Sequence, residues 1–284
     1  MIDLFENEFS QIDLKIPSAQ PSDIPLLFSR IPLDIFGMLL LDIPSKFQNI
    51  KAYFPSMASE EVQQNWTGAH GNDLLQQTAA FVKTLKCGYT ELTGKEIENS
   101  KVLDFGCGWG RIIRLLYKFT SFENIYAVDP WDESIIKCRE HGIKAELALS
   151  EWVPKSLPFK CRFDFIYSFS VFTHLSEKTA HTALQTLRNC IAADGLLAIT
   201  IRPKEYWYIH DKGALATEMV QRHSEKGFAY TPLYGQTPIN GDITYGNASI
   251  SMDYIHSHFP QWRIVSADYN LIDPYQVVLF LKPV

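Results

Sequence analysis

The chain has 284 residues, of which 46% are hydrophobic and 20% are charged, as is usual for a soluble globular protein. Its formal net charge is -6, its isoelectric point is near 5.8, and no dense run of lysine and arginine occurs. Because phosphate backbones are neutralised by clustered cations, this composition argues against a nucleic acid as the main partner.

The cysteines and the first residues indicate the compartment. The five cysteines form no Cys-x-x-Cys pair, whereas a disulfide framework or a structural zinc site needs close, paired spacing. We therefore expect free thiols and no bound metal. The acidic start MIDLFENEFSQ lacks the basic residues of a secretory signal, and the apolar run Ile35 to Leu41 is far shorter than the roughly 20 residues of a membrane span. These features predict a cytoplasmic protein without a membrane span.

Residues 1–64 form a proline-rich leader. Proline recurs too often there for a long helix, so the sequence predicts an irregular segment with short helices. Its apolar runs, such as IPLLFSRIPLDIFGMLLLDIP, indicate that it packs on the rest of the chain. A helical pattern then begins near Ser59, and Gly88 is its predicted end.

Short apolar runs alternate with helical patterns from residue 101 onward. Strands are predicted at 101–105, 124–129, 144–149, 163–170 and 196–203. The helices between them are predicted at 111–119, at 132–142 with Asp132 as a possible N-cap, and at 176–195, opened by Ser176 and closed by Asp194-Gly195. Another helix at 251–259 precedes two strands at 262–270 and 275–282, which are expected to pair as a hairpin.

This order predicts an α/β fold. Strands separated by helices form a doubly wound, mainly parallel sheet, and right-handed crossovers place helices on both of its faces. We expect seven strands, the last of them antiparallel, in a domain at residues 65–284 that follows the leader. Residues 204–250 interrupt the pattern as an aromatic insertion, expected to be a helix followed by irregular chain.

The glycine turn DFGCGWGR, residues 104 to 111, follows the first predicted strand. Ligands of doubly wound sheets bind beyond the carboxyl ends of the strands, and glycine lets the backbone approach them closely. A Walker loop would end in Gly-Lys-Ser/Thr, which is absent here. A dinucleotide turn would have a small residue where Arg111 stands. The remaining pattern is Asp-x-Gly-x-Gly-x-Gly.

This pattern resembles the first motif of the class I S-adenosylmethionine-dependent methyltransferases. The resemblance continues through NIYAVDP, FDFIYSFSVFTHL and the terminal pair of strands, and it covers residues 65 to 284. It implies that S-adenosylmethionine is the cofactor. The physics agrees, because this cofactor is cationic at sulfur and has no pyrophosphate, so its site needs carboxylates more than amides that cradle phosphate.

The resemblance also implies roles for residues near the strand ends. Asp104 would face the methionine amino group, and Asp129 would accept both ribose hydroxyls, because a carboxylate can take two donors. The other predicted cofactor contacts near these acids are Gly106, Cys107, Gly108, Gly110, Arg111 and Pro130. Arg111 would bind the cofactor carboxylate or form a surface ion pair.

Further cofactor contacts are predicted outside the turn. The family often places an acid after the third strand to hold the adenine amine, and the candidates here are Ser150, Glu151 and Trp152. Ser170, Val171 and Phe172 follow the fourth strand, where donor and acceptor would meet. From the helix before the sheet domain, Trp66 and Gly68 would close the site.

Candidates for catalysis and substrate binding are fewer. His174 is either a general base for a hydroxyl acceptor or a structural histidine, and the second interpretation is favoured because methyl transfer needs mainly alignment. In the insertion, Tyr206, Trp207, His210 and Tyr230 would contact the substrate, or would form an aromatic roof over the core.

The sequence therefore predicts methyl transfer to a hydroxyl or amine of a small-molecule or glycan acceptor. The alternative is a non-catalytic protein that retains the fold as a cofactor-binding or scaffold module. A nicotinamide dehydrogenase is a distant third hypothesis. The acceptor and the oligomeric state do not follow from the sequence.

Overall fold

The computed structural model describes residues 2–269, 272–273 and 275–284, and the chain divides into two compact units, Met1–Leu149 and Ser150–Val284. Unit 1 contains the helices and strands α1 (Glu6–Lys15), α2 (Ile24–Leu27), α3 (Leu33–Leu41), α4 (Gln48–Tyr53), α5 (Glu60–Thr67), α6 (Gly71–Thr93), β1 (Val102–Phe105), α7 (Arg111–Leu116), β2 (Ile125–Asp129), α8 (Asp132–Glu140) and β3 (Glu146–Leu149). Unit 2 contains β4 (Phe163–Ser168), α9 (Glu177–Cys190), β5 (Ile191–Ile201), α10 (Trp207–His210), α11 (Ala214–Lys226), β6 (Phe228–Pro232), β7 (Gly246–Ile250), α12 (Met252–His258), β8 (Trp262–Asp268) and β9 (Val277–Pro283).

The strand order confirms the predicted fold class. Seven strands form a sheet in the order β3-β2-β1-β4-β5-β9-β8, and β9 runs antiparallel to both β5 and β8. The pairs β1–β2, β2–β3 and β4–β5 are parallel. Every residue of β1 is buried, which agrees with a central strand covered on both faces. In unit 1, β1 and β2 pair in register, so that Asp104 lies opposite Ala127.

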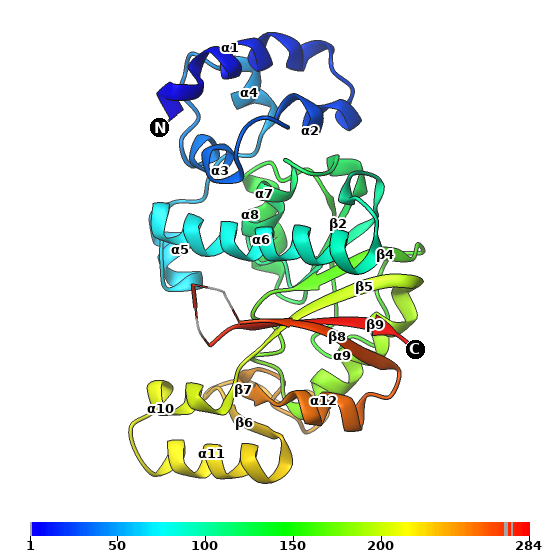
Figure 1. Ribbon diagram of the computed structural model, residues 1–284. Helices are drawn as coiled ribbons and strands as arrows, with labels where there is room; N and C mark the ends of the chain where they lie inside the picture. Colours follow the sequence, from blue (N-terminus) through cyan, green and yellow to red (C-terminus); the bar gives the residue numbers. More distant parts are fainter. Residues whose placement is uncertain (1, 270–271, 274) are drawn as a thin grey trace. The chain divides into compact units, whose positions relative to one another are not determined.

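The leader is more helical than its prolines suggest, and it packs within unit 1. Helix α3 lies against α6 and α7: a β-carbon built on Gly37 would lie 2.4 Å from Leu75 Cδ1 and 3.2 Å from Leu115 Cδ2. The rings of Phe28, Phe36 and Phe54 meet edge to face, with centroids 5.1 to 5.5 Å apart. Figure 1 shows α1 and α4 side by side beyond α3. The domain boundary after residue 64 stays a prediction.

Two predicted helix ends in this chain are wrong. Helix α6 continues through Gly88 to Thr93, and Gly94, with φ of 70°, supplies the left-handed residue that ends it. Helix α9 ends at Cys190 rather than at Asp194-Gly195, because β5 already begins at Ile191. Its predicted start is confirmed, since Ser176 Oγ accepts a hydrogen bond from Thr179 N. Asp132 opens α8 but makes no N-cap hydrogen bond there.

The insertion in unit 2 is more regular than predicted. Helix α11 lies along the antiparallel ribbon of β6 and β7 (Figure 1), and a small core of Trp207, Ala216, Met219 and Ala229 joins them. Irregular chain is confined to residues 233–245, where the glycine and proline punctuation is concentrated. The helix predicted at 251–259 and the terminal hairpin are both present. Asn270, the predicted last residue of the first hairpin strand, lies outside the described residues.

Candidate functional site

The glycine turn follows β1 directly. Gly106, Gly108 and Gly110 have φ values of 88°, 53° and 78°, a region that residues with side chains rarely adopt. The N–H groups of Gly106 and Cys107 both donate to Val128 O, at 2.8 and 3.1 Å, which fastens the turn to the end of β2. A β-carbon at Gly110 would also lie 2.8 Å from Ile143. The turn therefore needs glycine for both conformation and space.

Asp129, the last residue of β2, holds the turn with its side chain. Its Oδ2 accepts a hydrogen bond from Gly108 N at 2.9 Å, and its Oδ1 accepts one from Trp131 N at 3.0 Å. Burial raises the pKa of this carboxyl above its usual range, while the two backbone N–H groups oppose that shift. Ser134 is a further side-chain donor to this carboxylate, which still has acceptor capacity for a ligand hydroxyl because a carboxylate offers about four lone-pair sites.

Asp104 and Arg111 lie at the two ends of the turn. Asp104 is 1% exposed at the carboxyl end of β1. Burial lowers the pKa of Arg111 to about 10, and the charge of Asp104 partly opposes this shift, so the two charges lie close enough to interact. Arg111 Nη1 donates to Thr78 Oγ1 at 3.3 Å. The side chain is thereby directed along α6 and is not an isolated surface cation.

Helix α5 places Trp66 beside the turn. A β-carbon built on Gly108 would lie 4.0 Å from Trp66 Cε3, and Gly68 ends α5 in the left-handed conformation. The Trp66 ring stacks on Trp131, with centroids 4.6 Å apart and planes 18° apart. Trp131 is 46% exposed. Sequence reasoning missed Trp131, although its position directly after Asp129 and Pro130 is a usable signal.

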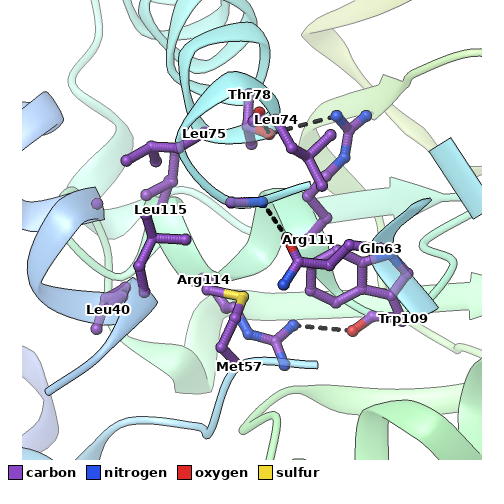
Figure 2. A pocket seen from close by; sticks show the side chains of 13 residues that line it. Leu40, Met57, Gln63, Leu74, Leu75, Thr78, Trp109, Arg111, Arg114 and Leu115 are labelled. Atoms are coloured by element: carbon purple, nitrogen blue, oxygen red, sulfur yellow. Dashed lines mark hydrogen bonds between the residues drawn. The ribbon is translucent and has the colours of Figure 1, made fainter. Parts of the chain in front are cut away.

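A small pocket lies beside the turn in unit 1. Figure 2 shows Arg111, Trp109 and Gln63 along one side of it, and Leu40, Leu75 and Leu115 along the other. Its remaining lining residues are Gly37, Leu41, Met57, Gly71, Leu74, Thr78 and Arg114.

Arg114 stabilises the glycine turn through hydrogen bonds within unit 1. It is 1% exposed, and its Nη1 donates to Trp109 O and Gly110 O at 2.8 and 2.9 Å, while Nη2 donates to Ser56 O at 2.7 Å. Its guanidinium lies 4.8 Å from the Trp109 ring. The sequence gives no signal for this role, because arginine on a helix is usually exposed.

The loop after β4 in unit 2 is held by several polar contacts. Ser170 has φ of 59°, and its N–H donates to Thr200 Oγ1 at 2.7 Å. Phe172 is fully buried, whereas Val171 is partly exposed. Such a conformation at a residue with a side chain is strained and is found most often at functional sites.

His174 makes hydrogen bonds with both ring nitrogens. Its Nδ1 lies 2.7 Å from Gly246 O and therefore carries the proton, and its Nε2 lies 3.2 Å from Arg202 Nη2, which donates to it. Burial, with a contribution from Arg202, lowers the pKa of His174 to about 4. The Tyr245 ring stacks on the imidazole at 5.0 Å. The neutral ring is thus fixed in one tautomer, with its lone pair engaged.

The insertion residues form two kinds of contact. Tyr206 stacks on His210, lies under the Arg202 guanidinium at 4.0 Å and donates to Asn247 Oδ1 at 3.0 Å. Tyr230 donates to Ile243 O. Trp207 is 0% exposed and donates to Ser249 Oγ at 2.7 Å, so its position favours packing over substrate contact.

The segment that follows β3 is exposed. Glu151 and Trp152 both lie on the surface of unit 2, with Trp152 39% exposed, and Ser150 is partly buried. Cys107, in contrast, is buried beside Cys138, and this thiol contact together with burial raises its pKa well above the usual range. It is therefore a protonated packing residue of the turn.

Two further searches of the described residues gave no candidates. Within them, no three or more His, Cys, Asp or Glu side chains are grouped so that they could bind a metal ion. Across the same part of the chain, every helix is too short or too polar to cross a membrane.

Comparisons with known proteins agree with this fold. Residues 102–195 match the family model of the methyltransferase domain. An S-adenosylmethionine-dependent methyltransferase from Clostridium acetobutylicum has a similar structure, with 12% identity, coverage of 78% of this chain and 96% of that chain, and a TM-score of 0.51. The PH0226 protein from Pyrococcus horikoshii is similar over 72% of this chain and 90% of that chain, with 14% identity and a TM-score of 0.50. The search of curated proteins gave no match.

Residues 102–195 therefore match a methyltransferase domain, and the chain has the fold of the S-adenosylmethionine-dependent methyltransferase family. S-adenosylmethionine is the cofactor of that family, and the buried carboxylates beside a glycine turn suit a cationic ligand that bears a ribose.

Proposed function

We propose that the protein transfers a methyl group from S-adenosylmethionine to a hydroxyl or amine of a small-molecule or glycan acceptor. The observation that carries this proposal is the Asp129 carboxylate, which is fixed by Gly108 N and Trp131 N at the end of β2 and is a charged acceptor for ribose hydroxyls. When bound, S-adenosylmethionine supplies an electrophilic methyl group for a lone pair of the acceptor.

The residues of the chain would bind and orient the reactants. Asp129 would accept the ribose hydroxyls, Asp104 would face the amino group and Arg111 would face the carboxylate of the cofactor. Gly106, Cys107, Gly108, Gly110 and Pro130 would shape the backbone around it, and Trp66 and Gly68 would exclude water. Ser150, Glu151 and Trp152 would hold the adenine, and Ser170, Val171 and Phe172 would line the place where the methyl group moves.

His174 is proposed as a positioning residue. Its lone pair already accepts a hydrogen bond from Arg202, so it has little capacity to take a proton from an acceptor. Its hydrogen bonds to Gly246 O and Arg202 instead fix the loop after β4 relative to the insertion. Tyr206, His210 and Tyr230 are the proposed acceptor contacts, because their rings are at least partly exposed.

Calorimetry with S-adenosylhomocysteine tests the cofactor proposal. We expect the wild-type protein to bind it and Asp129→Ala to weaken binding by about 10- to 100-fold, since two charged hydrogen bonds are lost. Asp132→Asn is the matched control, because this exposed acid lies three residues further along the chain and contacts only Glu133 N. Equal affinity of Asp129→Ala and wild type would remove the proposed ribose contact.

Catalysis is tested separately from binding. Labelled S-adenosylmethionine incubated with a metabolite extract should give a labelled organic product that depends on the protein. Tight binding of S-adenosylhomocysteine without such a product favours the alternative, a cofactor-binding module that does not catalyse transfer. A parallel incubation with total cellular nucleic acid tests the other class of acceptor, and we do not expect it to be labelled.

A further inference from the structure

Gln276 has a buried side-chain amide at one end of the sheet in unit 2. It immediately precedes β9, and the pairing of Ile201 with Val277 places it beside the carboxyl end of β5. The side chain is 4% exposed. Its Nε2 donates to Ser170 Oγ at 3.1 Å, whereas its Oε1 has no hydrogen-bond partner among the described residues.

The other side chains of this cluster are already engaged. Ser170 Oγ lies 3.1 Å from Thr173 Oγ1, and the strained backbone of Ser170 is fixed by Thr200 Oγ1. Thr173 is fully buried. The Gln276 amide is therefore held by its nitrogen end against a rigid loop at the carboxyl ends of β4 and β5, where ligands of such sheets bind.

An unpartnered buried amide oxygen is unfavourable, and a ligand that donates a hydrogen bond would satisfy it. The ligand must supply an O–H or N–H donor, because an amide oxygen only accepts. Continuing the register of β5 and β9 places Arg202 opposite Gln276, and Arg202 donates to Thr173 O and Asn247 Oδ1. A neutral donor suits a site beside this cation better than an ammonium group does.

We propose that Gln276 Oε1 binds the neutral O–H or N–H group of the methyl acceptor and thereby selects acceptors that carry such a donor. This assignment rests on the proposed methyltransferase function. Gln276 would accept a hydrogen bond from the acceptor atom, so that a lone pair of that atom is left free for the methyl group, and the acceptor proton passes to solvent once the new bond has formed.

The first test is thermal unfolding of the ligand-free protein. Gln276→Leu removes the unpartnered oxygen together with the hydrogen bond to Ser170 Oγ and keeps most of the side-chain volume; the relief from the buried oxygen offsets the lost bond, so we expect the Tm to stay equal to or rise above that of wild type. If Gln276 only braces Ser170, the same variant loses a useful hydrogen bond and its Tm falls. Gln185→Leu, a change of the same kind at an exposed position of α9, is the control and should leave the Tm unchanged.

The second test compares binding with transfer. Because Ser170 stays fixed by Thr200 Oγ1 and Thr173 Oγ1, we expect Gln276→Leu to keep most of the affinity for S-adenosylhomocysteine and to lower labelled methyl transfer to a metabolite extract by about tenfold or more. Gln276→Glu, which keeps acceptor oxygens, should retain more transfer than Gln276→Leu.

The outcomes separate the two proposals. Absence of S-adenosylhomocysteine binding by wild type would overturn the proposed function itself. Wild-type binding without any transfer, equal transfer by Gln276→Leu, or a lowered Tm with transfer retained would each overturn the role of Gln276 alone.

Discussion

His174 shows how burial decides the behaviour of a single residue. A histidine in an exposed loop would titrate near neutral pH, but the Arg202 guanidinium and desolvation lower the pKa of His174 to about 4. The ring therefore remains neutral at physiological pH and acts as a fixed hydrogen-bond bridge between Gly246 O and Arg202.

This shift makes the stability of the protein depend on pH. Because the folded state disfavours the protonated ring, the contribution is fully present above the usual pKa of 6.5 and is lost as the pH falls toward 4. We expect the free energy of unfolding to fall by on the order of 2–3 kcal/mol across this interval from His174 alone. Urea denaturation at pH 7 and pH 5 measures it.

The matched variants identify the residue responsible. His174→Gln should flatten the part of the slope that this ring contributes, whereas His256→Gln, at an exposed position of α12, should leave the slope as in wild type. An identical slope in His174→Gln and wild type would contradict the assignment.

At the scale of elements, the stacked rings of Trp66 and Trp131 connect α5 to the segment after β2. Two indoles at 4.6 Å and 18° should give a coupled near- and far-ultraviolet circular dichroism signal. We expect that signal to be lost in Trp66→Phe and in Trp131→Phe, and to change when S-adenosylhomocysteine binds beside Gly108. Trp152→Phe should preserve it, and a signal that persists in Trp66→Phe would show that the pair is not stacked in solution.

Gly246 sets the spacing of the β6–β7 ribbon. A β-carbon there would lie 2.0 Å from Thr231 O, and backbone atoms cannot move aside as a flexible side chain can. We expect Gly246→Ala to lower the free energy of unfolding by about 2–3 kcal/mol. Gly213→Ala, where nothing lies within 4 Å, should change it by less than about 0.5 kcal/mol. Chemical denaturation compares the two, and similar losses in both would contradict the steric argument.

The sequence predicts the elements that are specified by neighbouring residues. Prediction fails for features that depend on contacts between residues distant in the sequence. The glycine turn and Asp129 are predicted because parallel strands always bring their carboxyl ends to one edge. Gly88 does not end α6, because apolar residues on both sides of it continue the buried face from Leu85 to Tyr89. The sequence does not predict the roles of Arg114, of Trp131 or of the hydrogen bond from Arg202 to His174, because each depends on contacts between residues far apart along the chain.

At the scale of the whole molecule, the chain divides where regular structure is absent. Residues 150–162, at the start of unit 2, contain no helix or strand, and Lys155 and Lys160 are exposed within them. Exposed irregular segments are the usual sites of proteolysis. We expect trypsin to cut first after Lys155 or Lys160 and to release two fragments close in size to the two units, as measured by mass spectrometry. The double variant Lys155→Gln, Lys160→Gln should resist this cut, and a first cut inside α9 or α11 would contradict the expectation.

The ribbon of β6 and β7 is tied to the rest of unit 2 by main-chain hydrogen bonds. Gly246 N donates to His174 O, Ala248 N to Thr173 O and Ile250 N to Arg202 O. Directed evolution of the proposed acceptor specificity would therefore act on two regions that differ in their tolerance of substitution. Changes within the ribbon would disturb the loop after β4, whereas residues 234–238 are mostly exposed and can be randomised with little effect on folding. A library confined to that segment is the natural starting point for altering specificity.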